Sequence, residues 1–211
     1  MTLPLSGVLV VSLEQAVAAP MCTCKLADAG ARVLKIERPE GDFARTYDTL
    51  AHGECSYFVW LNRGKESVVL DLTTAADRAL LAATLKRSDV FVQNLKPGAI
   101  EKLGFPIAEL RREFPRLICC SISGFGETGP YAARKAYDLL IQAESGLASI
   151  TGTSEPARVG GIRRRHHDRL ECLSIDPRSL DLARAHRRRR RAFGVHVRRR
   201  GRLDVRAVVA I

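Results

Sequence analysis

A chain of 211 residues that is 46% hydrophobic and 27% charged is long enough to bury one sizeable core. No apolar run approaches the ~20 residues of a membrane-spanning helix, which argues against a membrane partner. The N-terminus lacks the basic stretch of a secretory signal, so we expect a cytoplasmic protein. Six cysteines fit neither paired zinc-ligand spacing nor a small disulfide framework, which predicts reduced and mostly buried thiols: Cys22, Cys24, Cys55, Cys119, Cys120 and Cys172.

The net charge of +11 comes entirely from the last 50 positions. Residues 1–161 hold 18 Lys and Arg against 18 Asp and Glu, whereas residues 162–211 hold 16 Arg, no Lys and 5 acids. We therefore divide the chain into a domain over residues 1–160 and an arginine-rich tail over residues 161–211. Arginine blocks without apolar periodicity predict a disordered or poorly ordered tail, in which only residues 205–211 could hide apolar surface.

Strands and helices alternate along the first part of the chain. In chain order, the pattern predicts a buried strand at 7–13, a helix at 18–29 ending at Gly30, a strand at 32–37, a strand at 67–72, a helix capped by Thr73 and running to about 87, a strand at 90–93, a strand at 117–123 and a helix at 138–148. This alternation predicts an α/β fold, a Rossmann-like parallel sheet with helices on both faces.

A dinucleotide-dependent oxidoreductase is excluded by the segment between the first strand and the first helix. Residues 12–20 read Ser-Leu-Glu-Gln-Ala-Val-Ala-Ala-Pro and contain no glycine, so the G-x-G-x-x-G fingerprint is missing. No P-loop and no G-x-S-x-G element occurs either, and the pair Gly124 and Gly126 is typical of an ordinary loop.

Several blocks, in order, carry a resemblance to a known family. They are "EQAVAAPMCTCKLADAGARVLKIERPEGDFAR", "WLNRGKESVVLDL", "SDVFVQNLKPGAIEKLGF" and "SISGFGETGPYAARKAYDLLIQAESGLASITGT". From Leu5 to Val159 the chain resembles the N-terminal half of family III (CaiB/BaiF-type) CoA transferases. The resemblance implies a CoA-binding Rossmann-like domain, interlocked homodimers, and CoA transfer from an acyl-CoA to a small carboxylic acid. An α-methylacyl-CoA racemase or isomerase of the same superfamily is the alternative.

The resemblance also implies a set of residues that line the CoA site, and it implies no metal: Arg38, Leu70, Asn94, Lys102, Lys135 and Tyr137. The physical chemistry of CoA is compatible with this set. Its phosphates favour contacts with Arg38, Lys102 and Lys135, and the loop at 94–98 follows a strand end, where open α/β sheets bind ligands.

The family's catalytic aspartate attacks the acyl-CoA thioester and forms a mixed anhydride. The family places it in a Val-Val-Asp-Ile type of segment shortly after the stretch matching "GTSEPARVG", but residues 162–169 here read Ile-Arg-Arg-Arg-His-His-Asp-Arg. Asp168, His166 and His167 lie among arginines without a packed turn or a third ligand, so we assign no catalytic residue and no metal ligand. The chain as written is expected to be inactive.

A frameshift near Gly160 and Gly161 explains this segment. Codons allowed for residues 162–169, read one nucleotide later, spell Ser-Val-Val-Asp-Ile-Met-Thr, and codons for residues 195–208 give a second family-like segment in the same frame. Sixteen arginines without a lysine have a probability on the order of 4 in 10,000 if the tail draws its basic residues as the first part does. The alternative is a functional tail that binds nucleic acid non-specifically through its arginines.

Overall fold

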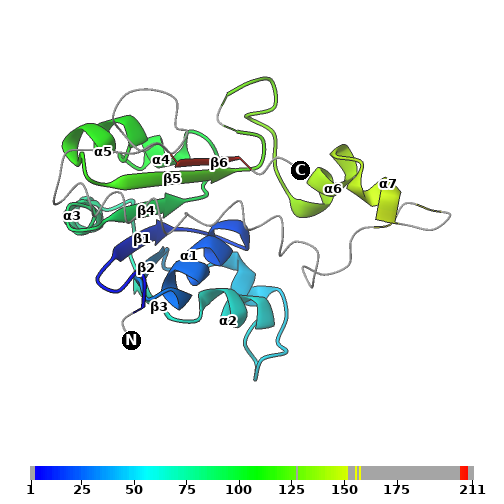
Figure 1. The fold of residues 1–211 in the computed structure, drawn as a ribbon, viewed down its shortest axis with the longest axis horizontal. Helices are drawn as coiled ribbons and strands as arrows, with labels where there is room; N and C mark the ends of the chain where they lie inside the picture. The colour runs from blue at the N-terminus through cyan, green and yellow to red at the C-terminus, as the bar shows by residue number, and fades with distance from the viewer. Residues whose placement is uncertain (1–2, 127, 152–154, 156, 158–204, 209–211) are drawn as a thin grey trace.

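The computed structural model describes residues 3–126, 128–151, 155, 157 and 205–208. Its centre is one sheet of parallel strands in the order β3-β2-β1-β4-β5-β6 (Figure 1). The strands are β1 (Leu9–Leu13), β2 (Arg32–Glu37), β3 (Lys65–Val69), β4 (Val90–Gln93), β5 (Ile118–Ser123) and β6 (Val205–Val208). The predicted parallel α/β sheet is confirmed.

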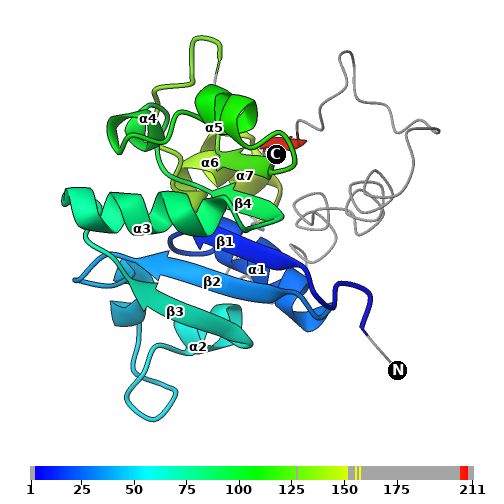
Figure 2. The same cartoon turned by 90° about the vertical axis from the view of Figure 1, so that its left-hand side faces the viewer.

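Helices cover both faces of this sheet, as expected for parallel strands joined by crossovers. The described helices are α1 (Ala18–Asp28), the 3-10 turn η1 (Phe43–Thr46), α2 (Ser56–Asn62), α3 (Ala75–Leu85), α4 (Ala99–Lys102), α5 (Ile107–Glu113), α6 (Asp138–Glu144) and α7 (Leu147–Thr151). Figures 1 and 2 show α1 and α2 on one face and α3 on the other. Helices α6 and α7 lie beyond the carboxyl end of β5, away from the sheet (Figure 1).

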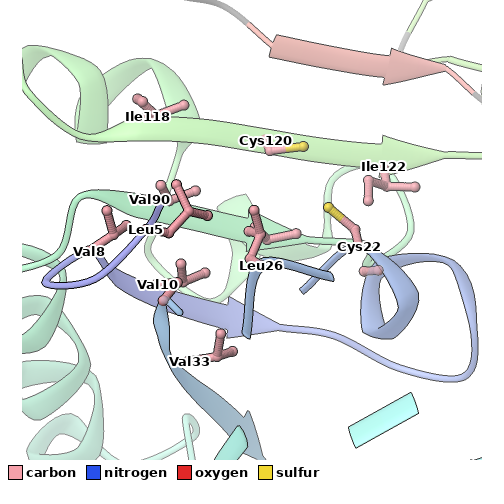
Figure 3. Close-up of a cluster of buried hydrophobic side chains, with 13 residues drawn as sticks. Leu5, Val8, Val10, Cys22, Leu26, Val33, Val90, Ile118, Cys120 and Ile122 are labelled. Atoms are coloured by element: carbon pink, nitrogen blue, oxygen red, sulfur yellow. The ribbon is translucent and has the colours of Figure 1, made fainter. Parts of the chain in front are cut away.

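Alternating strand residues build two hydrophobic cores, one on each face. Val10 belongs to the core under α1, which Cys22 and Leu26 complete from the helix (Figure 3). The next residue, Val11, belongs to the opposite core, which includes Leu81 of α3. The two central strands therefore read as continuous apolar runs because both of their faces are covered.

The observed strand bounds lie within a few residues of the predicted ones. Strands β2 and β4 match the predicted residues, and β1 and β5 begin two positions and one position later than predicted. Strand β3 begins at Lys65, two positions before the β-branched run that predicted it, and ends at Val69 instead of residue 72. The predicted cap was wrong by one residue. The Thr74 hydroxyl accepts from the Asp77 backbone at 3.2 Å and caps α3, whereas Thr73 donates to the Asp71 carboxylate at 2.6 Å.

The predicted helix at 138–148 is interrupted. Gly146 has a φ of +75°, a conformation that ends a helix, so α6 stops at Glu144 and α7 begins at Leu147. Helices α2, α4 and α5 were not predicted. Each has at most seven residues, too few for a 3.6-residue period to appear clearly in the sequence.

The arginine-rich tail falls almost wholly outside the described residues, so its predicted disorder stays a prediction. Val205–Val208 is described as β6, which pairs with β5 in parallel and lies within the stretch expected to hide apolar surface. Five of the six cysteines are described, and all five are buried and outside any disulfide; Cys172 lies outside the described residues. None of the described helices has the length and apolar character needed to cross a bilayer.

Candidate functional site

A cleft of about 400 Å³ opens at the carboxyl ends of the first four strands. It lies where strand order reverses between β1 and β4, the position at which open α/β sheets bind ligands. Its walls come from strand ends and the loops after them: Leu13, Glu14, Gln15, Ile36, Glu37, Arg38, Pro39, Glu40, Gly41, Asp42, Leu70, Asp71, Leu72, Thr73, Leu95 and Leu103. The fold thus gathers four loops around one partly apolar cavity.

The structure brings some of the predicted site residues together and leaves others apart. Arg38 and Leu70 line the cleft, and Asn94 and Lys102 directly precede the lining residues Leu95 and Leu103. Lys135 and Tyr137 do not line it. Both are exposed on the segment before α6.

Tyr137 nevertheless lies within electrostatic range of the segment after η1. Burial raises the pKa of the Tyr47 phenol, and Asp42, Cys55 and Tyr137 add smaller contributions in the same direction.

Arg38 is the cation best placed to meet a ligand. Its Nε donates to the carbonyl of Gly41 at 3.1 Å, and its nearest carboxylate oxygen, on Glu40, lies 3.9 Å from Nε. The side chain is 54% exposed, so much of the planar guanidinium faces solvent at the mouth of the cleft.

A buried polar network lies beneath the cleft, and it begins with an ion pair between Glu14 and Lys65. The two side chains are 0% and 2% exposed and their charged atoms are 2.7 Å apart. The Thr23 hydroxyl donates to the other Glu14 oxygen at 2.6 Å. Burial lowers the pKa of the Lys65 ammonium below its ordinary value, and the Glu14 carboxylate opposes that shift.

A second buried pair joins Lys35 of β2 to Asp42, at 2.8 Å and with each side chain 1% exposed. Asn62 of α2 links this pair to the first, because its side-chain oxygen accepts from Lys35 at 3.0 Å and from Lys65 at 3.1 Å. One amide oxygen thus lies between two ammonium groups. This arrangement satisfies donors that neither carboxylate reaches.

A third pair joins Glu37 to Arg45. The guanidinium donates two hydrogen bonds to the carboxylate, at 2.9 and 3.1 Å, and lies 3.8 Å from the centre of the Phe58 ring. Burial alone would raise the pKa of Glu37, but hydrogen bonds from Arg45 and Ser67 and the charge of Lys35 bring it below its ordinary value.

The network contains three carboxylates and three cations, so the charges of these six groups cancel. No feature of the sequence described above predicted this network. The available signal was the pair Lys35 and Glu37 on a strand expected to be covered on both faces, because a charge in such a strand needs a buried partner. No group of three His, Cys, Asp or Glu side chains suited to a metal occurs within the described ranges.

Comparison with known proteins gives consistent matches over the first three quarters of the chain. The model of CoA-transferase family III matches residues 5–162. An acetyl-CoA:oxalate CoA-transferase from Acetobacter aceti is 45% identical over 161 residues, which cover 75% of this chain and 41% of that protein. A succinate–glutarate CoA-transferase from Agrobacterium fabrum is 41% identical over 167 residues, covering 74% and 42%.

The crystal structure of a CaiB/BaiF family protein from Brucella suis is similar with a TM-score of 0.75 and 35% identity. That match covers 89% of this chain and 51% of the other. The chain therefore spans about half the length, or less, of these proteins.

Substitution of Lys65 by Met tests whether Glu14 and Lys65 stabilise the fold as a coupled pair. The single change leaves Glu14 buried without its cation and should destabilise the fold by about 3–5 kcal/mol. Adding Glu14→Gln, which keeps a partner for Thr23, should recover more than half of that loss. Urea denaturation followed by circular dichroism measures both. Equal destabilisation by the single and double variants would contradict a coupled pair.

Acid should destabilise the fold over a defined range of pH. Hydrogen bonds from the backbone of Ser56 and Leu50 and from the Ser56 hydroxyl lower the pKa of Asp48 from 3.8 to about 2. A carboxyl with a lowered folded pKa stabilises the fold above its unfolded pKa, and this contribution is lost as the pH falls through the folded value. We expect the melting temperature to fall between pH about 4 and about 2, with Glu37 contributing in the same direction.

The Asp48→Asn variant should have a flatter acid limb, a lower melting temperature at pH 7, and convergence with the wild type near pH 2. Glu101→Gln, at an exposed position on α4, removes one negative charge as a control. An acid limb that is unchanged in Asp48→Asn would show that other carboxyls dominate.

Proposed function

Since this chain belongs to CoA-transferase family III, we propose that residues 1–160 bind CoA in the cleft between β1 and β4. In a complete protein this domain would serve transfer of CoA from an acyl-CoA to a small carboxylic acid. The observation that carries the proposal is the position of Arg38 and Leu70 on a cleft at the topological switch point. The names of the two transferases described above support the reaction class.

Charge suggests how the ligand would lie. Five carboxylates line the cleft against one arginine, and three of the five are paired with cations: Glu14 and Asp42 with buried lysines, and Glu37 with the partly exposed Arg45. Such a wall suits an uncharged part of CoA, namely the adenine ring against apolar side chains and the ribose against polar ones. The phosphates would then lie outside, where the exposed Arg38 and Lys102 can reach them, with Lys135 and Tyr137 closing over the ligand from the segment before α6.

The reaction itself requires a nucleophilic carboxylate that this chain lacks at the family's position. The family match ends at residue 162, where the arginine-rich composition begins, and this coincidence supports a change of reading frame there. Exposed apolar side chains on α6 and α7, at Leu139, Leu140 and Ile150, support the view that a complete protein, in its homodimer, covers this surface. A cytoplasmic location and the racemase alternative stay predictions.

CoA binding can be measured on the chain as it is. Calorimetric titration should show binding that weakens as salt increases, because the phosphates meet cations. Arg38→Ala should weaken the affinity by about tenfold or more, the usual effect of losing a charge-assisted hydrogen bond. Arg112→Ala, at an exposed position on α5, also removes one positive charge and should leave the CoA affinity nearly unchanged. A folded wild type that does not bind CoA would refute the proposal.

The reading frame can be tested at the level of DNA. Independent genomic reads across the codons for Val159 to Arg169 should show that the frame one nucleotide later encodes Val-Val-Asp-Ile and continues as family sequence. The repaired chain should then have transferase activity that Asp→Asn at that position abolishes. Codons incompatible with the shifted frame would refute the frameshift and return the tail to consideration as a nucleic-acid-binding segment.

A further inference from the structure

The loop between β1 and α1 has a conformation that its residues do not favour. It runs through Gln15 and Ala16 at the switch point, and Gln15 lines the cleft. Ala16 has a φ of +59°, in the left-handed region that glycine adopts freely and alanine does not. The loop contains no glycine, so contacts from outside must hold this conformation.

Asn94, which directly follows β4, holds Gln15 from one side. Its side-chain oxygen accepts from the Gln15 backbone N–H at 2.9 Å, and its side-chain nitrogen donates to the Gln15 carbonyl at 2.8 Å. Both ends of one amide side chain therefore engage both backbone groups of one residue, across 79 positions of sequence.

The residues beside Gln15 are held from other elements. The Ala16 backbone N–H donates to the Asp42 carboxylate at 3.2 Å, and that carboxylate is itself fixed by Lys35. Glu14 is held by Lys65. Three consecutive loop residues are thus fixed by side chains from the β3, β4 and β2 sides of the cleft.

We propose that Asn94, supported by Asp42, is a positioning residue that holds the β1–α1 loop in the shape the cleft requires. Its side-chain amide then acts on CoA through the loop and does not contact the ligand itself. This inference rests on the proposed function, because it assigns the means by which one predicted CoA-site residue acts. In the oxidoreductase fingerprint glycines give the loop its shape, whereas here side-chain hydrogen bonds do.

Asn94 is the cleaner of the two positions to change. Removing the Asp42 carboxylate would leave the buried Lys35 without its ion pair and would endanger the fold. Asn94 is uncharged and only partly buried, so its replacement leaves no orphaned charge. Asn94→Ala removes both hydrogen bonds to Gln15 and nothing from the buried pairs.

The test combines CoA affinity with hydrogen exchange on the full chain. Asn94→Ala should weaken CoA binding by about tenfold, as expected for two lost hydrogen bonds. It should also raise deuterium uptake of a peptide covering residues 14–17 without CoA, while peptides from β5 remain as protected as in the wild type. Glu109→Ala, at an exposed position on α5, serves as the control for both readouts.

A second substitution separates positioning from direct contact. Glycine adopts a positive φ without strain, so Ala16→Gly in the Asn94→Ala background should recover at least about threefold of the lost affinity. A side chain that touched CoA itself could not be replaced in this way. Full affinity in Asn94→Ala, unchanged deuterium uptake over residues 14–17, or no recovery by Ala16→Gly would each overturn the inference.

Failure of the proposed function gives a different result. If the folded wild type does not bind CoA, the affinity readout is lost for every variant, but deuterium uptake over residues 14–17 still reports whether Asn94 holds the loop. Unchanged uptake in Asn94→Ala would then reject the positioning role as well.

Discussion

The structure depends on pairing charges that its own fold buries. Lys35 and Lys65 lie on strands covered by α1 and α2, and neither ammonium reaches water to any useful extent. Burying an ammonium group costs several kcal/mol unless a partner compensates its charge. The partners of these two lysines are therefore held in defined positions. Because Asp42 comes from the β2 side, Glu14 from the β1 end and Asn62 from α2, this requirement sets how those segments lie against one another.

The same pairing shapes the cleft above it. Carboxylates that line a cavity normally repel a phosphorylated ligand, but Glu14 and Asp42 are each neutralised by a buried lysine, and Glu37 is neutralised by the partly exposed Arg45. The cleft wall is therefore polar but has only a weak electrostatic field. Such a wall suits the adenine ring and the ribose of CoA better than its phosphates. Asp42 also connects the ion pair to the β1–α1 loop, because one of its oxygens accepts from Lys35 and the other from the backbone of Ala16. Charge compensation and loop conformation are therefore parts of one arrangement.

The sequence predicted the centre of the fold better than its periphery. Continuous apolar runs identify β1 and β4, because a strand buried on both faces has no polar side to confuse the pattern. The short helices and the cap at Thr74 were not predicted. For the cap, adjacent threonines can both serve as N-cap residues, and only the backbone position of Asp77 decides between them. For the site, the resemblance supplied Arg38 and Leu70, which line the cleft. Glu14 lies 51 positions from Lys65 and Asn62 lies 27 positions from Lys35, and no local pattern predicts such contacts, whereas Asp42 is only 7 positions from Lys35.

The edge of the sheet at β5 bears on the origin of the tail. Val205–Val208 pairs with β5 as a parallel strand. This pairing is made by backbone groups, so any sequence that can adopt an extended conformation can form it. A short Val-Arg-Ala-Val stretch meets this condition whether or not it was selected for it. Covalent catalysis is more demanding, because a carboxylate must be held at a precise distance from a thioester carbon. A stretch that can pair with a sheet edge is therefore weak support for a functional tail, whereas an aspartate in a packed turn would be strong support for an intact enzyme.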